Sequence, residues 1–321
     1  MLAVALAGCG ALPGTATTDD VDPGPWIRTI DWPLRAPATA TWGESWVSPD
    51  GGTVVLTSSG NRPRAVDARG ASRWIAGGAT GADLVAGPPD AASVTATPVV
   101  AVAERGEQRV VLLDLATGSV VARVDVDADV GALGWAAPGT FLVASPDGVR
   151  TLSAAGELGE VVDIEDVRGI AFDPNRGGAW VTSAKGVVEV DPVSALEIST
   201  VELPGCRHPV GVDVDPVADR GAVACQGNGL VITFSLRTGA TLAVEEAPDE
   251  VAAVSFTDDG GGLVAVGAGG VATTYRVALR RLTERGTQDL GGTAPPVLVG
   301  RELLVPLDAP ARLRRMVTRW N

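Results

Sequence analysis

A unit of about forty residues recurs along this chain, and such an internal repeat constrains the fold more than any other feature of the sequence. In its clearest copy, residues 208–246, four β-rich runs alternate with turn sequences. The runs are residues 210–214, 221–225, 230–236 and 240–244. The breaks between them are Asp215-Pro216, Gly227-Asn228-Gly229 and Thr238-Gly239, which are residues that tight turns favour. Each unit therefore predicts one antiparallel sheet of four strands.

The turn between the third and fourth strands locates the other copies. It falls near residues 69, 117, 155, 193, 238 and 280, so six units are visible. Residues 295–320 and residues 26–32 supply the strands of a seventh unit, which joins the two ends of the chain and leaves no open sheet edge. We therefore predict an all-β protein, a β-propeller of seven blades with four antiparallel strands each. A parallel β-helix is the structural alternative, but its repeats are shorter.

The repeat also carries a family resemblance. The copy at 208–246 contains Pro-x-Gly-Val-x-Val-Asp-Pro, Ala-x-Ala-Cys, Gly-Leu-Val and Leu-x-Thr-Gly in that order. This unit resembles the YVTN-type, WD40-like propeller repeat of bacterial surface proteins, over roughly residues 40–310 and most closely over 167–246. The resemblance implies a fold and leaves function open, because propellers serve as hydrolases, dehydrogenases and binding modules. The Gly-His and Trp-Asp dipeptides of eukaryotic WD40 blades do not accompany these repeats.

Charge narrows the classes of partner. The chain has 39 acidic and 25 basic residues, for a net charge of −14. Such a surface repels phosphate backbones, so we expect no nucleic-acid binding. The sequence has no apolar stretch long enough for a transmembrane helix. We expect a monomer whose partner is a polar ligand or another protein.

The N-terminal residues are typical of an export signal. Leu6-Ala7-Gly8-Cys9 resembles the bacterial lipobox, which implies that Cys9 is lipidated and anchors the protein on the outer side of the cytoplasmic membrane. We interpret residues 1–9 as part of a lipoprotein signal, 10–25 as a flexible tether and 26–321 as one propeller domain. Because no Lys or Arg precedes Cys9, we expect the natural start to lie upstream. The alternative is a chance match at a cytosolic terminus.

The other two cysteines fall in one repeat. Cys206 precedes the first strand of its unit and Cys225 ends the second. In a propeller blade these two points lie at the same end, and an exported protein meets an oxidising compartment. We therefore predict a Cys206–Cys225 disulfide; two buried free thiols are the alternative.

The sequence offers little catalytic chemistry. It has one histidine, His208, which rules out a multi-histidine metal site, and no Gly-x-Ser-x-Gly elbow presents a serine nucleophile. We therefore assign no catalytic residue, no metal ligand and no cofactor. The loops that precede first strands and those that join second to third strands share the end that propellers usually use for ligands. The candidate ligand residues on these loops are Arg207, His208, Gln226, Asn228, Lys185, Arg168, Asn61 and Arg62.

These observations favour a membrane-tethered extracytoplasmic propeller that acts as a binding or scaffold module. The alternative is an extracytoplasmic propeller enzyme, either a lactonase-like hydrolase or a quinone-dependent dehydrogenase. The only argument for an enzyme is that other propellers are hydrolases or dehydrogenases.

Overall fold

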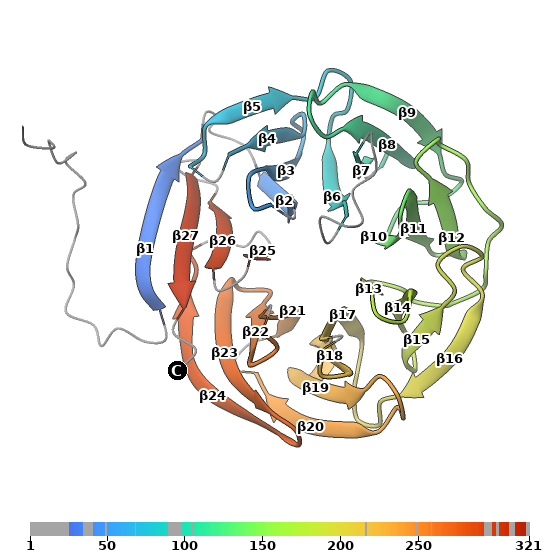
Figure 1. The fold of residues 1–321 in the computed structure, drawn as a ribbon. Coiled ribbons are helices and arrows are strands. Elements are labelled where there is room, and N and C mark those ends of the chain that lie inside the picture. Colours follow the sequence, from blue (N-terminus) through green and yellow to red (C-terminus); the bar gives the residue numbers. More distant parts are fainter. Residues whose placement is uncertain are drawn as a thin grey trace, which may run out of the picture.

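A computed structural model describes residues 26–34, 41–48, 50–67, 69–88, 98–104, 106–215, 217–247, 250–257, 259–291, 297–299, 302–307 and 312–318. These residues form a ring of seven antiparallel sheets, the blades of a β-propeller, around a central axis (Figure 1). The predicted fold class is therefore confirmed. Cys9, the signal and the tether lie outside the described residues.

The blades follow the chain. Blade 1 comprises β2 (Thr41–Val47), β3 (Val54–Ser59), β4 (Arg64–Val66) and β5 (Ser72–Ile75). Blade 2 comprises β6 (Ala82–Ala86), β7 (Val99–Glu104), β8 (Arg109–Asp114) and β9 (Val120–Asp125). Blade 3 comprises β10 (Ala132–Ala137), β11 (Thr140–Ser145) and β12 (Gly148–Ser153). Blade 4 comprises β13 (Ile170–Asp173), β14 (Gly178–Ser183), β15 (Gly186–Val190) and β16 (Glu197–Glu202).

The second half of the ring continues this order. Blade 5 comprises β17 (Pro209–Asp215), β18 (Arg220–Cys225), β19 (Leu230–Ser235) and β20 (Thr241–Glu246), with a short 3-10 helix, η1 (Gln226–Asn228), after β18. Blade 6 comprises β21 (Val251–Phe256), β22 (Gly262–Gly267), β23 (Val271–Ala278) and β24 (Arg281–Asp289). Blade 7 comprises β25 (Val297–Val299), β26 (Glu302–Leu307), β27 (Arg312–Thr318) and β1 (Trp26–Pro33).

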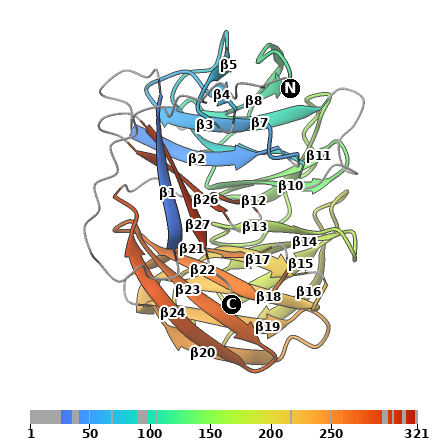
Figure 2. The same cartoon turned by 60° about the vertical axis from the view of Figure 1, so that its left-hand side comes forward.

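Blade 7 joins the two ends of the described chain. Its outer strand β1 pairs antiparallel with β27, from Trp26 opposite Thr318 to Pro33 opposite Arg312. Figure 2 shows β1 lying alongside β27. On the other side of the seam, the indole Nε1 of Trp42 in blade 1 donates to the carbonyl oxygen of Leu307 in blade 7, at 2.9 Å. The predicted closure by strands from both termini is therefore confirmed.

Blade 3 departs from the predicted four strands. After β12 the chain makes only two isolated bridges back to it, Val149 with Val162 and Leu152 with Leu158. Gly159 lies between these bridges, so close to β12 that an added Cβ would lie 2.3 Å from the hydroxyl of Thr151. At this close approach the N–H of Gly159 donates to the carbonyl of Thr151 at 2.9 Å, and the outer segment of blade 3 is irregular.

Polar residues at the ends of third strands fix the repeated turns. The side chains of five such residues accept hydrogen bonds from backbone N–H groups of the turn that follows, at 2.8–3.2 Å. They are Asp67, Asp114, Ser153, Asp191 and Ser235. Side-chain oxygens of Asp and Ser stabilise turns in this way, so the predicted turn positions are confirmed.

The core lies between blades. The second strands β7, β14, β18 and β22 are buried along their whole length, and the middle of each is apolar, as is typical of strands covered on both faces. The Thr-Gly turns also form part of the contact between blades. Gly118 has φ of +70°, and an added Cβ would lie 2.5 Å from the ring of Trp74 in the preceding blade. Glycine is required here both for the backbone conformation and for the packed indole.

Within the described residues, no helix has the length and apolar character of a membrane span.

Candidate functional site

The candidate site lies at one end of the ring, which we call the disulfide end. It is formed by the loops that precede first strands and by those that join second to third strands. All eight predicted ligand residues lie on such loops. Five of them, Lys185, Arg207, His208, Gln226 and Asn228, come together on blades 4 and 5.

A disulfide fixes the centre of this cluster. Cys206, just before β17, is bonded to Cys225, the last residue of β18, with their Cα atoms 5.2 Å apart. Cys225 is fully buried in the core between blades 4 and 5. The predicted disulfide is therefore confirmed, and a disulfide is typical of proteins in an oxidising compartment.

Hydrogen bonds fix the same loop against η1. The side-chain oxygen of Asn228 accepts from the backbone N–H of Arg207 at 3.2 Å, and its amide nitrogen donates to the carbonyl of Gly205 at 2.6 Å. Gln226 and Gly227 donate their backbone N–H groups to the carbonyls of His208 and Arg207, at 3.0 and 2.9 Å. Asn228 therefore holds the loop in place, while the side chains of Arg207 and His208 are exposed.

Lys185 and Arg168 extend the cluster along blade 4. The carbonyl of Lys185 accepts from the N–H of Leu203 at 3.4 Å, which places the β14–β15 turn beside the disulfide loop. A shallow hollow of about 340 Å³ is lined here by Lys185, Glu202, Leu203 and Pro204. Arg168 is half-exposed and pairs with Asp166, with 2.7 Å between Nε and Oδ1.

Asn61 and Arg62 lie apart from the others. They belong to the β3–β4 turn of blade 1, on the far side of the ring from blades 4 and 5 (Figure 1). The amide of Asn61 donates to the hydroxyl of Ser58 at 3.2 Å. The repeat places these two residues at the same end of the ring as the other candidates, but it does not say how far apart their blades lie.

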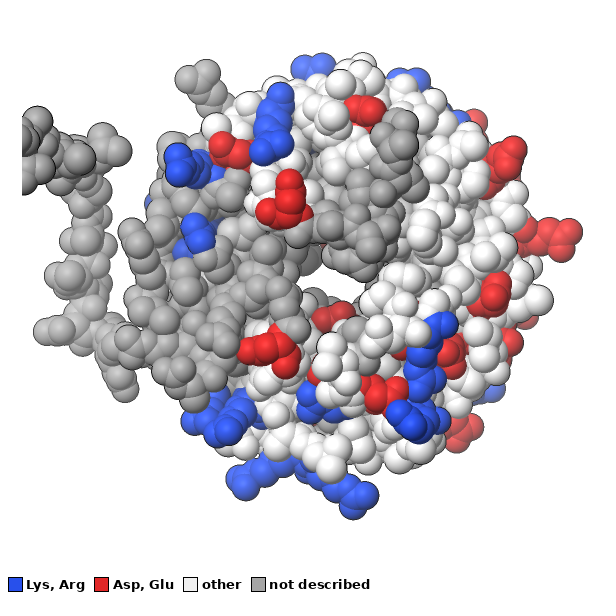
Figure 3. All heavy atoms as spheres, in the orientation of Figure 1, with Lys and Arg blue, Asp and Glu red and all other residues white. Residues whose placement is uncertain are grey.

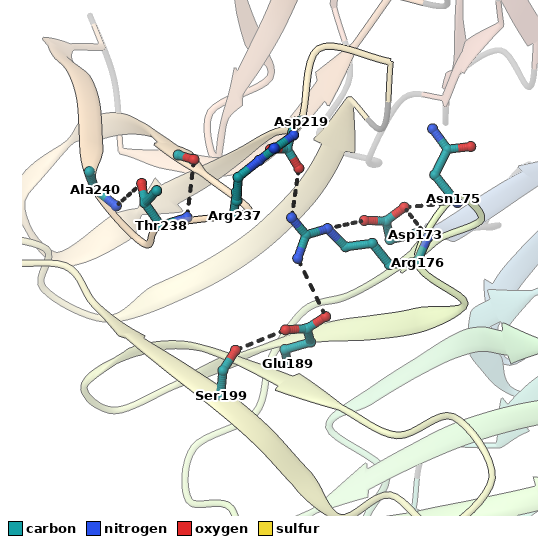
Figure 4. A network of polar contacts seen from close by, with 10 residues as sticks. Asp173, Asn175, Arg176, Glu189, Ser199, Asp219, Arg237, Thr238 and Ala240 are labelled. Carbon is teal, nitrogen blue, oxygen red and sulfur yellow. Dashed lines mark hydrogen bonds and ion pairs between the residues drawn. The ribbon is translucent and has the colours of Figure 1, made fainter.

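At the opposite end of blades 4 and 5, arginine side chains form ion pairs with aspartates. Figure 4 shows Arg176 of blade 4 and Arg237 of blade 5 converging on Asp219, at 2.7 and 2.9 Å. Arg176 also lies 3.6 Å from a carboxylate oxygen of the buried Asp173. By contrast, Lys185 and Arg207 at the disulfide end form no ion pair with any described residue. Their charges are therefore available to a ligand.

A larger hollow between blades 3 and 4 was not predicted. It has a volume of about 600 Å³ and lies at the disulfide end, next to Arg168. Its lining residues are Asp129, Val130, Gly131, Ser145, Pro146, Asp166, Val167 and Arg168. The repeat pattern places these loops at one end of the ring, but it does not give the distance between them. Figure 3 shows one face of the ring, hollowed at its centre, with acidic and basic side chains interspersed around it.

Asp213 on the innermost strand of blade 5 is a carboxylate between two blades. Its Oδ2 accepts from the backbone N–H of Phe256 at 2.7 Å and from the hydroxyl of Ser255 at 3.2 Å, both on the innermost strand of blade 6. Burial raises the pKa of Asp213 to about 6, and the nearby charge of Asp215 acts in the same direction. The hydrogen bonds to its carboxylate oppose this shift without cancelling it.

This pKa predicts a pH dependence of stability. Because the folded state binds a proton at Asp213 more tightly than the unfolded chain does, the extra stability is complete below about pH 4 and is lost as the pH rises through about 6. We expect the free energy of unfolding to be higher at pH 5 than at pH 7.5, with Asp213 contributing on the order of 1 kcal/mol. Urea unfolding at both pH values measures this difference. Asp213→Asn should reduce it, and an unchanged difference in the variant would contradict the assignment.

The disulfide gives a second prediction. Replacing both cysteines, as Cys206→Ser and Cys225→Ala, should lower the free energy of unfolding by about 3 kcal/mol, because the cross-link no longer restricts the unfolded chain. Amide hydrogen exchange of Arg207, Gln226 and Gly227 should also become faster, since their N–H groups bond within the loop that the disulfide fixes. Cys9→Ser is the control and should leave both measurements unchanged. Equal exchange in the double variant and the native protein would show that the hydrogen bonds alone fix the loop.

No group of three His, Cys, Asp or Glu side chains in the described part of the chain is arranged to hold a metal ion.

Comparison with known proteins finds no family model that matches the chain and no significant relative among curated proteins. The propeller architecture is therefore established by the structure, and the YVTN-type resemblance stays a prediction from the sequence.

Proposed function

We propose that this protein is an exported, membrane-tethered propeller that binds a polar ligand or a partner protein at the disulfide end. The observation that carries the proposal is the loop of residues 203–208, which a disulfide and four hydrogen bonds fix while Arg207 and His208 remain exposed. A fixed loop loses little conformational entropy on binding, and uncommitted charges supply specificity. Propeller blades provide the rigid scaffold on which such loops are carried.

We propose that a lipid on Cys9 is the membrane tether. We also propose that the protein is a surface protein with YVTN-type repeats. The Leu6–Cys9 sequence supports the tether, and the disulfide agrees with an oxidising location. Palmitate labelling and membrane fractionation of cells that express the protein test this step. We expect label and membrane association in the native protein and the loss of both in Cys9→Ser. Membrane association that persists in Cys9→Ser would reject the lipid anchor.

Site-specific photo-crosslinking in intact cells tests the binding face. A photoreactive residue placed at His208 should trap a discrete adduct, because His208 is exposed at the start of β17. The matched control is Ala218, which is exposed just beyond the opposite end of the same strand. Adducts at Ala218 and not at His208 would place binding at the end of the ring opposite the disulfide and would reject the proposal.

The enzyme alternative stays a prediction. Stoichiometric calcium or a quinone chromophore in the purified protein would favour it over the binding module.

A further inference from the structure

The hollow between blades 3 and 4 combines an apolar floor with a charged rim. Val130 and Val167 line it and are 3% and 5% exposed. Asp129 and the Asp166–Arg168 pair provide its charged groups. Its volume of about 600 Å³ lies within the range of pockets that bind small ligands, so it has room for a long side chain.

The carboxylates of the hollow are unequal. Asp166 is already paired with Arg168 at 2.7 Å. Asp129 is exposed and forms no hydrogen bond or ion pair with any residue that the structure describes. The hollow therefore has one carboxylate committed to the protein and one that is open to a ligand.

The surroundings make the hollow negative. Its own lining carries two carboxylates and one guanidinium. The loops that form it add Asp127, Asp147, Asp163 and Glu165, and of these only Asp127 contacts a cation, Arg150, at 3.9 Å. Such a field attracts cations and repels phosphates and carboxylates. An acceptor set of two carboxylates, one of them occupied by Arg168, suits an organic cation better than a metal ion, which takes more oxygen ligands.

We propose that this hollow receives a lysine or arginine side chain from a basic segment of a partner protein. The stem of that side chain packs on Val130 and Val167, and its charged end forms a hydrogen-bonded ion pair with Asp129. This inference rests on the proposed binding function and names the chemistry of its partner. Lys185 on blade 4 and Arg207 on blade 5 then face acidic groups of the same partner, so the two regions of opposite charge fix its orientation.

Fluorescence anisotropy with a labelled tri-arginine peptide tests the assignment at low ionic strength. We expect saturable binding that weakens with added NaCl, and no binding of a labelled tri-glutamate peptide. Asp129→Asn should weaken tri-arginine binding about tenfold or more, because it removes the charged partner of a charge-assisted hydrogen bond. Glu157→Gln is the matched control: it removes the same charge from an exposed turn of blade 3 at the opposite end, and should leave binding unchanged.

Several outcomes would overturn the assignment. They are failure of tri-arginine to bind, equal loss in Asp129→Asn and Glu157→Gln, and comparable binding of tri-glutamate. Thermal unfolding of both variants shows that they are folded. Crosslinking at His208 that persists while tri-arginine fails to bind would reject the hollow and retain the binding function. Peptide binding without any crosslink at His208 would retain the hollow and reject the loop of Arg207 and His208 as part of the binding surface.

Discussion

Replacing Arg220 with methionine is expected to lower the free energy of unfolding by about 3–5 kcal/mol, because the change leaves a buried carboxylate without its partner. Arg220 Nη2 lies 2.7 Å from Oδ2 of Asp215, and the Asp215 side chain is only 4% exposed. The same nitrogen donates to the carbonyl of Gly260 in blade 6 at 2.9 Å. Arg220 therefore neutralises a charge inside blade 5 and also joins that blade to the next.

Two further variants separate these contributions. Arg237→Met removes an arginine whose side chain is 76% exposed, although it too pairs with an aspartate, so it should cost less than about 1 kcal/mol. Adding Asp215→Asn to Arg220→Met should recover much of the loss, since the uncompensated charge is gone while an acceptor for the N–H of Ala218 remains. Urea unfolding of the four proteins measures these differences. No recovery in the double variant would show that the link to Gly260 is the dominant contribution.

The fold was predictable because its signals are local and repeated. Five copies of the unit carry a polar turn residue, such as Asp114 or Asp191, that makes hydrogen bonds within a few residues of itself. The closure of the ring was predictable for a different reason. The six internal units leave the strand-forming residues at both termini without pairing partners. Pairing β1 with β27 gives each of these segments a partner strand.

What the repeat did not predict depends on contacts in three dimensions, both within and between blades. The outer segment of blade 3 is irregular and brings Gly159 close to Thr151, and the sequence alone does not give that distance. The hollow beside Arg168 requires the spacing of three loops from two blades. The sequence predicted the position of Asn228 but not its role, because an asparagine side chain can bind a ligand or stabilise a loop. In the structure its side-chain oxygen and nitrogen both form hydrogen bonds within the loop.

The division of charge between the two ends of blades 4 and 5 also emerges only in three dimensions. Arg176 and Asp219 are 43 residues apart, yet their side chains form an ion pair across two blades. An arginine in a turn has the same sequence signature whether it joins two blades or faces solvent. Cations that join blades and cations that face solvent are therefore distinguished by their partners and not by their spacing.

Replacing Trp180 with alanine is expected to cost about 3–5 kcal/mol, the usual range when a buried aromatic side chain is truncated to alanine. Trp180 of blade 4 is fully buried, and its ring lies edge-on to that of Phe234 in blade 5, with the centroids 5.6 Å apart. Phe234 in turn packs against Gly221, where an added Cβ would lie 2.2 Å from its ring. The indole therefore fills a space that the surrounding strands have little freedom to close.

Trp180→Phe is the informative companion to this variant. The indole Nε1 is buried and has no hydrogen-bond partner among the described residues, so tryptophan carries an unsatisfied donor here. Phenylalanine keeps most of the ring contact with Phe234 and removes that donor, so its cost should be less than about half that of alanine. Thermal and urea unfolding of the three proteins measure the difference. If phenylalanine lowers the free energy of unfolding as much as alanine does, the indole nitrogen has a hydrogen-bond partner. The shape of the side chain alone then does not explain why tryptophan occupies this contact between blades.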